Sequence, residues 1–177
     1  ADVTYIHGPL KINSEITDGI KKLKINNSLE LKNAIKKEIN NYDYFLMNAA
    51  VTDMKISNDI SVKLPKEDIQ KQICENLELV PDILRDILSL KKDNQKFIGF
   101  SAFTGDLEKL RTSIKKKFEI KGCDVIFANP IDLENQGFGE TSENGGWLFT
   151  KNGENCFIEK TSKLELANLL INKIISI

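Results

Sequence analysis

The sequence contains little histidine, cysteine and arginine, and each scarcity excludes a kind of site. Its 177 residues include one histidine and three cysteines. Ser-His-Asp and Cys-His catalysis would both have to use His7, and no pair of histidines exists to bind a catalytic metal. Cys74, Cys123 and Cys156 are scattered and lack a CxxC spacing, which argues against a disulfide framework or a structural zinc site. We therefore expect a reducing compartment and no resident metal.

Charge imbalance and long hydrophobic runs are also lacking. Lys and Arg number 25 and Asp and Glu number 26, so the formal net charge of −1 gives no electrostatic case for binding nucleic acid. Arg85 and Arg111 are the only arginines, and the abundance of lysine reflects a compositional bias rather than a function. No apolar run approaches the roughly 20 residues that span a bilayer, and no signal peptide precedes the first predicted strand. We expect a cytoplasmic protein without a membrane or nucleic-acid partner.

Short apolar runs alternate with segments of helical period, a pattern typical of a parallel sheet with crossover helices. The predicted strands are residues 3–7, 23–25, 44–51, 97–103 and 125–128. Helices are expected over residues 28–39, 81–90 and 106–122. A hairpin with an Asn-Gly turn should join 145–150 to 156–159, and a last helix should run from 162 to about 175.

Local start and stop signals support these helices. Asn27 and Glu30 are spaced as a capping box, and Pro81 suits a first helical position. Asp106 can cap the third helix, which should end near Gly122. Residues 53–76 and 130–146 are poorly explained as core and are expected to be loops, which in compact domains are often functional.

Polar and small residues follow three of the predicted strands. In open α/β sheets, ligands bind beyond the carboxyl ends of the strands. We therefore expect residues 3–7, 44–51, 97–103 and 125–128 to form one sheet whose carboxyl ends converge on a pocket with Asp53, Phe100 and Asn129. The alternative is that the alanine pairs and the strand-ending asparagines serve packing and turns.

Individually placed lysines offer a second indication. Lys63 lies in a polar loop, where a mobile cation could close over a phosphate or an oxyanion. Lys117 and Lys121 are four residues apart and share one helix face, although a solvated basic face would show the same spacing. The Gly137-Phe138-Gly139 stretch is too short for a dinucleotide fingerprint.

An ordered set of short segments resembles a known family, the phosphopantothenoylcysteine synthetase (phosphopantothenate-cysteine ligase) domain. These segments are VTYIHGP (3–9), NAAVTD (48–53), Lys63, VPDIL (80–84), IGF (98–100), AN (128–129) and GF (137–138). In most bacteria this domain is the C-terminal half of the bifunctional coenzyme A biosynthesis flavoprotein. The resemblance extends over nearly all of residues 1–177, which we expect to form one N-terminally incomplete ligase domain.

The resemblance implies a Rossmann-like α/β fold, with a mostly parallel sheet, flanking helices and a C-terminal hairpin plus helix. It implies ligation of 4'-phosphopantothenate to cysteine through an acyl-cytidylate, with CTP as co-substrate and Mg²⁺ held with the nucleotide. FMN would belong only to a fused or partner phosphopantothenoylcysteine decarboxylase domain, and a homodimer is expected. Such activation depends on positioning the reactants and neutralising charge, so a chain with one histidine can perform it.

The resemblance also assigns roles to individual residues. Lys63 falls at the catalytic flap lysine. Residues at nucleotide-binding positions are Met47, Asn48, Ala49, Asp53, Lys63, Val80, Pro81, Asp82, Ile83, Phe100, Lys117 and Lys121. A substrate pocket would include Ala50, Asn129 and Phe138.

The chain departs from the family pattern in several places. The family's first strand, its Thr-Gly-Gly-Thr turn and an Asn-Ser-Ser-Gly segment are missing, so we expect these 177 residues alone to ligate poorly. A Lys-x-Lys-Lys motif reads Lys63-Leu64-Pro65-Lys66, and Pro130 replaces an aspartate. Two alternatives therefore stay open: an ATP-using monofunctional ligase, and a non-catalytic assembly module for a flavin-binding decarboxylase.

Overall fold

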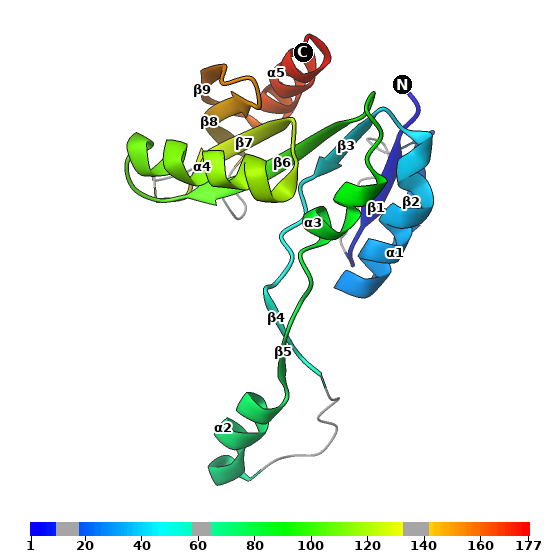
Figure 1. Cartoon of the computed structure of the whole chain (residues 1–177), viewed down its shortest axis with the longest axis vertical. Coiled ribbons are helices and arrows are strands. Elements are labelled where there is room, and N and C mark those ends of the chain that lie inside the picture. Colours follow the sequence, from blue (N-terminus) through cyan, green and yellow to red (C-terminus); the bar gives the residue numbers. More distant parts are fainter. Residues whose placement is uncertain (10–17, 58–64, 133–141) are drawn as a thin grey trace. The chain divides into compact units, whose positions relative to one another are not determined.

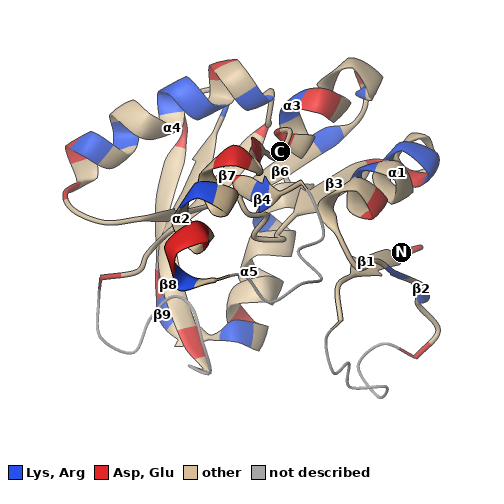
Figure 2. Cartoon of the chain, turned by 90° about the horizontal axis from the view of Figure 1, so that it is seen from below, with Lys and Arg blue, Asp and Glu red and all other residues tan. Residues whose placement is uncertain are grey.

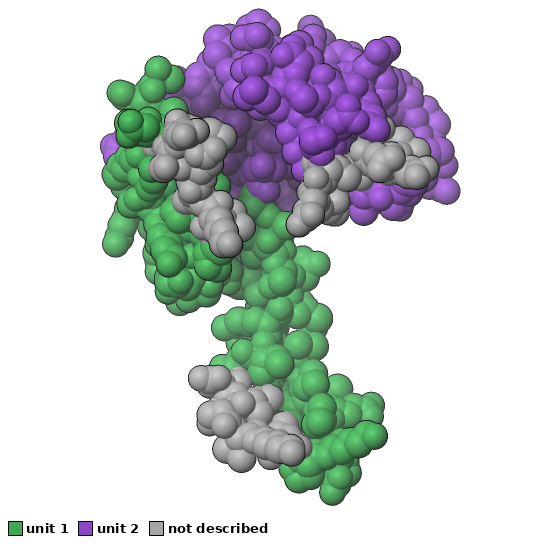
Figure 3. Space-filling view, turned by 180° about the vertical axis from the view of Figure 1, so that it is seen from behind, with its two compact units in different colours: residues 1–38, 49–89 green, residues 39–48, 90–177 purple. Residues whose placement is uncertain are grey.

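The computed structural model describes residues 1–9, 18–57, 65–132 and 142–177, which form two compact units. The first unit comprises residues 1–38 and 49–89, and the second comprises 39–48 and 90–177. Figure 1 labels the elements, and Figure 3 colours the two units.

The second unit contains a five-stranded sheet in the order β3-β6-β7-β8-β9. Its strands are β3 (Tyr44–Met47), β6 (Lys96–Phe103), β7 (Val125–Pro130), β8 (Glu143–Thr150) and β9 (Asn155–Ser162). Neighbouring strands among β3, β6 and β7 pair in parallel, whereas β8 and β9 are antiparallel additions. A mostly parallel sheet with a C-terminal hairpin, as the sequence predicts, is confirmed.

Helices pack on this sheet through its alternating side chains. On one face, Ile98, Phe127 and Leu148 of the sheet join Leu166 and Leu170 of α5 (Lys163–Ile175) in one buried cluster. Because side chains alternate along a strand, Ser101 points to the other face from Ile98. The contact between Ser101 and Lys117 of α4 (Leu107–Lys121) places α4 on that other face.

Asp124 joins the starts of β6 and β7. Its backbone N–H donates to the Phe97 carbonyl at 2.8 Å, and the Phe97 N–H donates to Asp124 Oδ2 at 2.7 Å. The Lys91 ammonium lies 2.6 Å from the same carboxylate oxygen and 5.3 Å from the centre of the Phe97 ring. From this point the two strands keep one register, from Ile98 opposite Val125 to Phe103 opposite Pro130.

The first unit contains a parallel pair of short strands and two helices. Its elements here are β1 (Thr4–His7), β2 (Lys21–Lys24), α1 (Ser28–Glu38) and α3 (Ile83–Ile87). Leu31 and Ile35 of α1 are buried, as are Ile83 and Ile87 of α3. An ion pair of 2.5 Å between Lys32 and Asp86 connects the two helices. The 3-10 turns η1 (Ile39–Asn41) and η2 (Leu88–Leu90) follow α1 and α3.

An arm extends the first unit between Asp53 and Val80. It consists of β4 (Met54–Ile56), α2 (Lys66–Glu75) and β5 (Leu77–Leu79), with β4 and β5 paired antiparallel. None of the described residues of these three elements is buried. The arm therefore contributes no side chain to either core.

Most local signals in the sequence are confirmed. Asn27 caps α1, with its side chain accepting from the Glu30 N–H at 2.9 Å, although the Glu30 carboxylate reaches back to the Asn26 N–H instead of the cap's own. Asp106 caps α4 by accepting from the Lys109 N–H at 2.8 Å, and this hydrogen bond lowers the pKa of the Asp106 carboxyl. Helix α4 ends at Gly122, where φ is 59°.

The two C-terminal elements also form as predicted. The hairpin of β8 and β9 turns through residues 151–154, where Gly153 has a φ of 94°. Helix α5 begins after Ser162, whose hydroxyl accepts from the Glu165 N–H at 3.1 Å.

Three predictions about the sheet and its connections are wrong. Strand β1 pairs with β2 and does not belong to the sheet of β3, β6 and β7. The prediction of a shared sheet is wrong because a hydrophobic run indicates a strand without specifying its partner. The strand expected over 44–51 stops at Met47, and exposed small and polar residues follow. Residues 53–76 are not a continuous loop, since they contain β4 and α2.

The start of the second helix also differs from the prediction. Asp82 is the N-cap, its side chain accepting from the Arg85 N–H at 3.3 Å, so Pro81 precedes the helix. A short polar side chain before a helix competes effectively with proline for this boundary because it satisfies a free N–H group.

Among the described segments, no helix is both long and apolar enough to cross a bilayer.

Gly146 marks the closest approach of β8 to the carboxyl end of β7. A Cβ atom on Gly146 would lie 2.3 Å from the Ala128 carbonyl oxygen and 3.0 Å from the Asn129 Cα. Because both neighbours are backbone atoms, they can move only if the strands separate. The register between β8 and β9 also shifts between Asn144 and Gly146.

We predict that Gly146→Ala lowers the free energy of unfolding by roughly 3 kcal/mol, since overpacking against a rigid neighbour is strongly destabilising. Gly153→Ala is the matched control, because its positive φ is strained but nothing lies within 4 Å of its added Cβ. It should cost about 1 kcal/mol. Urea denaturation followed through Trp147, the single tryptophan, measures both. Equal losses in the two variants would contradict the proposed clash.

Candidate functional site

The carboxyl ends of β3, β6 and β7 lie side by side in the second unit. Met47, the last residue of β3, pairs with Gly99 of β6, and Ala102 of β6 pairs with Asn129 of β7. Met47 and Asn129 are half-buried, and Asn48 is exposed directly after β3. Ala102 is small and exposed, so it leaves backbone accessible for a ligand near the end of β6, whereas Gly99 is buried. Three of the residues predicted for the site are therefore at one edge of one sheet.

Lys117 and Lys121 lie on the helix that covers this sheet. Both are half-buried, whereas the neighbouring Lys115 and Lys116 are exposed. Figure 2 shows that basic and acidic residues both occur along α4. The Lys117 ammonium donates to the Ser101 hydroxyl at 2.5 Å. Burial lowers the pKa of Lys117, and the nearby charge of Lys121 lowers it further. Lys117 reaches Ser101 near the end of β6, whereas Lys121 ends α4 beside Gly122, whose carbonyl accepts from Lys91 at 3.2 Å. Two half-buried cations on one helix face are an arrangement that an anionic ligand would stabilise.

Phe100 occupies the opposite face of the sheet from Ser101. Its ring centre lies 6.2 Å from that of Phe127, and it packs against the cluster that includes α5. The ring is only partly buried. A ligand touching both Phe100 and Lys117 would therefore have to cross the end of β6 rather than lie on one face.

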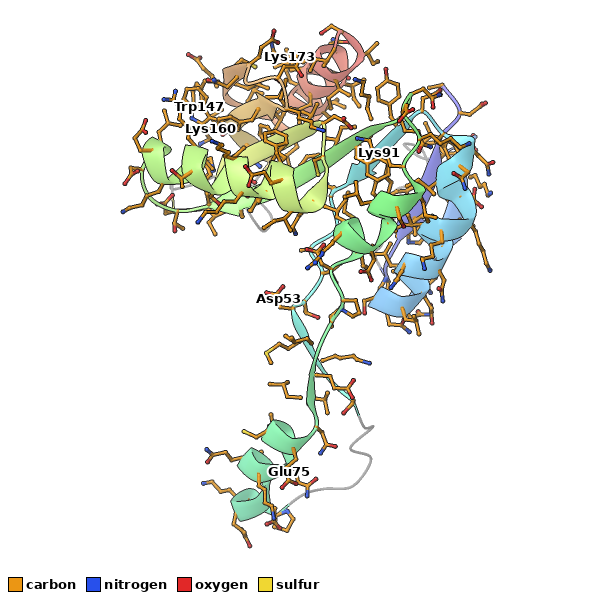
Figure 4. The ribbon with its side chains drawn as sticks, in the orientation of Figure 1. Asp53, Glu75, Lys91, Trp147, Lys160 and Lys173 are labelled. Carbon is orange, nitrogen blue, oxygen red and sulfur yellow. The ribbon has the colours of Figure 1, made fainter. Side chains whose placement is uncertain are left out.

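The remaining predicted nucleotide positions belong to the first unit. Asp53, which is labelled in Figure 4, directly precedes β4, and Val80 directly follows β5. The Val80 N–H donates to the Asp53 carbonyl at 2.8 Å and joins the two residues at this end of the ribbon. Asp53, Pro81 and Asp82 are exposed, as are Ala49 and Ala50. Ile83 is 4% exposed, so its side chain belongs to the core and only its backbone could reach a ligand.

The predicted residues thus form two groups, one in each unit. The pocket expected to join Asp53 with Phe100 and Asn129 stays a prediction, because these residues belong to different units. Lys63 and Phe138 lie outside the described residues.

Ser101 is the residue that the sequence analysis did not single out. It is 5% exposed and accepts a hydrogen bond from Lys117, one of the predicted site lysines. Its signal in the sequence is weak but real: a hydroxyl in the otherwise apolar run of β6. A buried polar side chain in such a strand requires a partner, and the partner is Lys117.

Metal ligands and surface hollows do not add to the site. Within the four described segments, no group of three or more His, Cys, Asp or Glu side chains could hold a metal ion. A hollow of about 470 Å³ lies along α4 and is lined by Glu108, Lys109, Thr112, Ser113 and Lys116. None of these five residues is among those predicted for the site.

The fold and the site define a class: a Rossmann-like α/β domain with a mostly parallel central sheet and two half-buried lysines on a helix that covers one face of it. The model of the DNA/pantothenate metabolism flavoprotein C-terminal domain family matches residues 1–177. The chain belongs to this family.

Related sequences and structures agree with this assignment. The chain is 29% identical over 174 residues to the coenzyme A biosynthesis bifunctional protein CoaBC of Vibrio cholerae, covering 98% of this chain and 42% of that protein. It is 26% identical over 182 residues to CoaBC of Escherichia coli, covering 99% and 42%. The chain therefore spans less than half the length of these relatives.

Two solved structures have the same fold. The C-terminal domain of a coenzyme A biosynthesis bifunctional protein CoaBC superimposes with a TM-score of 0.73 at 25% identity, covering 99% of this chain and 75% of that one. The DNA/pantothenate metabolism flavoprotein from Streptococcus pneumoniae gives a TM-score of 0.70 at 18% identity, covering 99% and 81%.

Proposed function

We propose that this chain is the phosphopantothenate-cysteine ligase part of a protein of coenzyme A biosynthesis. The observation that carries the proposal is the family match over the whole chain. The half-buried pair of Lys117 and Lys121 on α4 supports it, because ammonium groups neutralise the negative charge of a bound triphosphate. The relatives are bifunctional by name, so a fused decarboxylase that binds FMN is part of the proposal, as is a cytoplasmic location.

The proposed reaction has two steps and needs no nucleophilic side chain. The carboxylate of 4'-phosphopantothenate attacks the α-phosphorus of CTP, and pyrophosphate leaves. The cysteine amine then attacks the acyl carbon of the cytidylate, CMP leaves, and an amide forms. Both steps build charge on phosphoryl or acyl oxygens, which positioned ammonium groups stabilise.

The predicted residues of both groups, with Phe138, divide the work in this proposal. Lys117 and Lys121 bind the phosphates, and Phe100 contacts the nucleotide across the end of β6. Asn129 and Ala50, with Phe138, contact the acyl substrate. The other nucleotide contacts are Met47, Asn48, Ala49, Asp53, Val80, Pro81, Asp82 and Ile83.

Mg²⁺ is proposed to enter with CTP. The described residues hold no group of three or more His, Cys, Asp or Glu side chains that could bind the ion. Phosphate oxygens and water suit Mg²⁺, which keeps part of its hydration shell in such complexes. The ion would neutralise phosphate charge alongside the two lysines.

The proposal is tested by assaying the complete protein that carries this chain. It is incubated with 4'-phosphopantothenate, cysteine, Mg²⁺ and either CTP or ATP, and the product is measured by mass spectrometry. We expect ligation with CTP, and pyrophosphate release with CTP when cysteine is omitted. Product with ATP alone would favour the monofunctional alternative, and no product with either would favour the assembly module.

Lys63 is proposed as the residue that stabilises the developing charge. Lys63→Gln keeps the length of the side chain and removes its charge, so it should cost roughly 2–4 kcal/mol of transition-state stabilisation and leave CTP affinity nearly intact. Single-turnover formation of the cytidylate and its conversion by cysteine measure the effect. Lys116→Gln, an exposed lysine of α4, is the control. Near wild-type rates for both steps in Lys63→Gln would remove it from the catalytic machinery.

The arm supports the expected homodimer. In its register, Met54 lies opposite Leu79 and Ile56 opposite Leu77, so four apolar side chains share one face of the ribbon. The opposite face carries the ion pair of Lys55 and Glu78, at 3.4 Å. A two-stranded ribbon has no core of its own, and an uncovered apolar face is a poor surface in water. A second copy of the same ribbon would cover this face.

We predict that Leu79→Glu weakens this dimer, because it would bury a charge in the apolar contact. Leu79 is 76% exposed, so the substitution should leave the protomer folded. Lys55→Ala, on the opposite face of the ribbon, is the matched control. Sedimentation velocity of the complete protein over a range of concentrations measures the change. A concentration dependence equal in Leu79→Glu and wild type would exclude this face as the interface.

A further inference from the structure

Lys117 has a side-chain partner without charge, in contrast to Lys91 of the same unit. Lys91 lies 2.6 Å from the Asp124 carboxylate, so its charge is neutralised within the fold. Lys117 instead donates to the Ser101 hydroxyl. Among the described residues, no carboxylate lies within ion-pair distance of Lys117. Its charge is positioned but not compensated.

Ser101 is well placed to direct this ammonium. It pairs with Ala128 in the β6–β7 register, one residue before Ala102 pairs with Asn129 at the sheet edge. Its hydroxyl makes a long hydrogen bond of 3.4 Å to the Ala102 carbonyl and accepts from Lys117 with its oxygen. Since an ammonium has three N–H donors, two remain for a ligand.

A carboxylate at this position would have held Lys117 equally well, but it would also have cancelled the charge that a phosphate requires. A hydroxyl fixes the direction of the side chain at a small electrostatic cost. Without any acceptor, the flexible lysine stem would lose its preferred geometry, and ordering it would fall on the ligand.

We propose that Ser101 is a positioning residue for nucleotide binding, which holds the Lys117 ammonium toward the phosphates of the nucleoside triphosphate. This inference rests on the proposed function and names a residue for the same site. Ser101 acts through Lys117 and does not touch the reacting atoms. Its loss should therefore weaken nucleotide binding and leave the chemical steps largely unchanged.

A double-mutant cycle tests the proposal in the complete protein. The variants are Ser101→Ala, Lys117→Ala and the double variant, and Ser113→Ala, an exposed serine of α4, is the control. CTP with Mg²⁺ is titrated calorimetrically, and kcat and KM are measured for each. Ser101→Ala should raise the Kd and KM for CTP roughly ten- to a hundredfold, as expected for a lost hydrogen bond to a charged group. Its kcat should stay within about twofold of wild type.

The double variant decides the mechanism. If Ser101 acts through Lys117, adding Ser101→Ala to Lys117→Ala should weaken binding no further. Two results would overturn the role of Ser101 while leaving the proposed function intact. One is a loss of CTP affinity on adding Ser101→Ala to Lys117→Ala that equals the loss in the wild-type background. The other is an unchanged Kd in Ser101→Ala. Failure of the wild-type protein to bind CTP would instead overturn the proposed function and, with it, the phosphate role of Lys117.

Discussion

The register between β6 and β7 is the constraint on which the site of the second unit depends. Asp124 sets it at the start of both strands, with two hydrogen bonds to the backbone of Phe97. Because side chains alternate along a strand, a slip of one residue would turn every side chain to the opposite face. Ser101 would then point toward α5 and away from Lys117. An anchor at one end of the strands thus determines the chemistry available at the other.

Lys91 and Lys117 show how the bonding partner of an ammonium group determines whether its charge is neutralised within the fold. Lys91 is paired with a carboxylate and packs over an aromatic ring, so its charge serves the fold. Lys117 is held by a hydroxyl, and burial and Lys121 both lower its pKa. Bringing an uncompensated cation close to another one is unfavourable in the free protein. The proposed triphosphate would remove this cost on binding.

The arm explains why the sequence pattern predicts a loop over residues 53–76, where the structure has β4 and α2. Strands β4 and β5 have three residues each, and they pair across more than twenty residues of sequence, from Met54 to Leu79. Each strand alternates apolar, charged and apolar residues, but three residues are too few to distinguish a strand from a loop. The charged pair of Lys55 and Glu78 adds to the polar composition of the segment. Only the pairing shows that the apolar residues lie together on one face. The prediction for residues 3–7 is also limited by pairing. The hydrophobic run correctly indicates strand β1, but it does not specify that β1 pairs with β2.

Local interactions are what the sequence determined by itself. The caps at Asn27, Asp106 and Ser162 each join groups three residues apart, so their spacing is visible in the chain. The β8–β9 hairpin is equally local, and its Asn-Gly turn was sufficient to predict it. These contacts are enclosed in a few residues, so their geometry depends little on the rest of the molecule.

Contacts between distant residues were decided only by the tertiary structure. The spacing of Lys117 and Lys121 indicated a shared face, but burial against the sheet distinguished them from Lys115 and Lys116. The partnership of Ser101 with Lys117 spans sixteen residues and two elements, and it exists only because α4 packs on that face of β6. Hydrophobic pattern and capping chemistry specify most of the elements that form, although not β4, α2 and β5. Which side chains meet across them is set by strand register and helix packing, which no local pattern encodes.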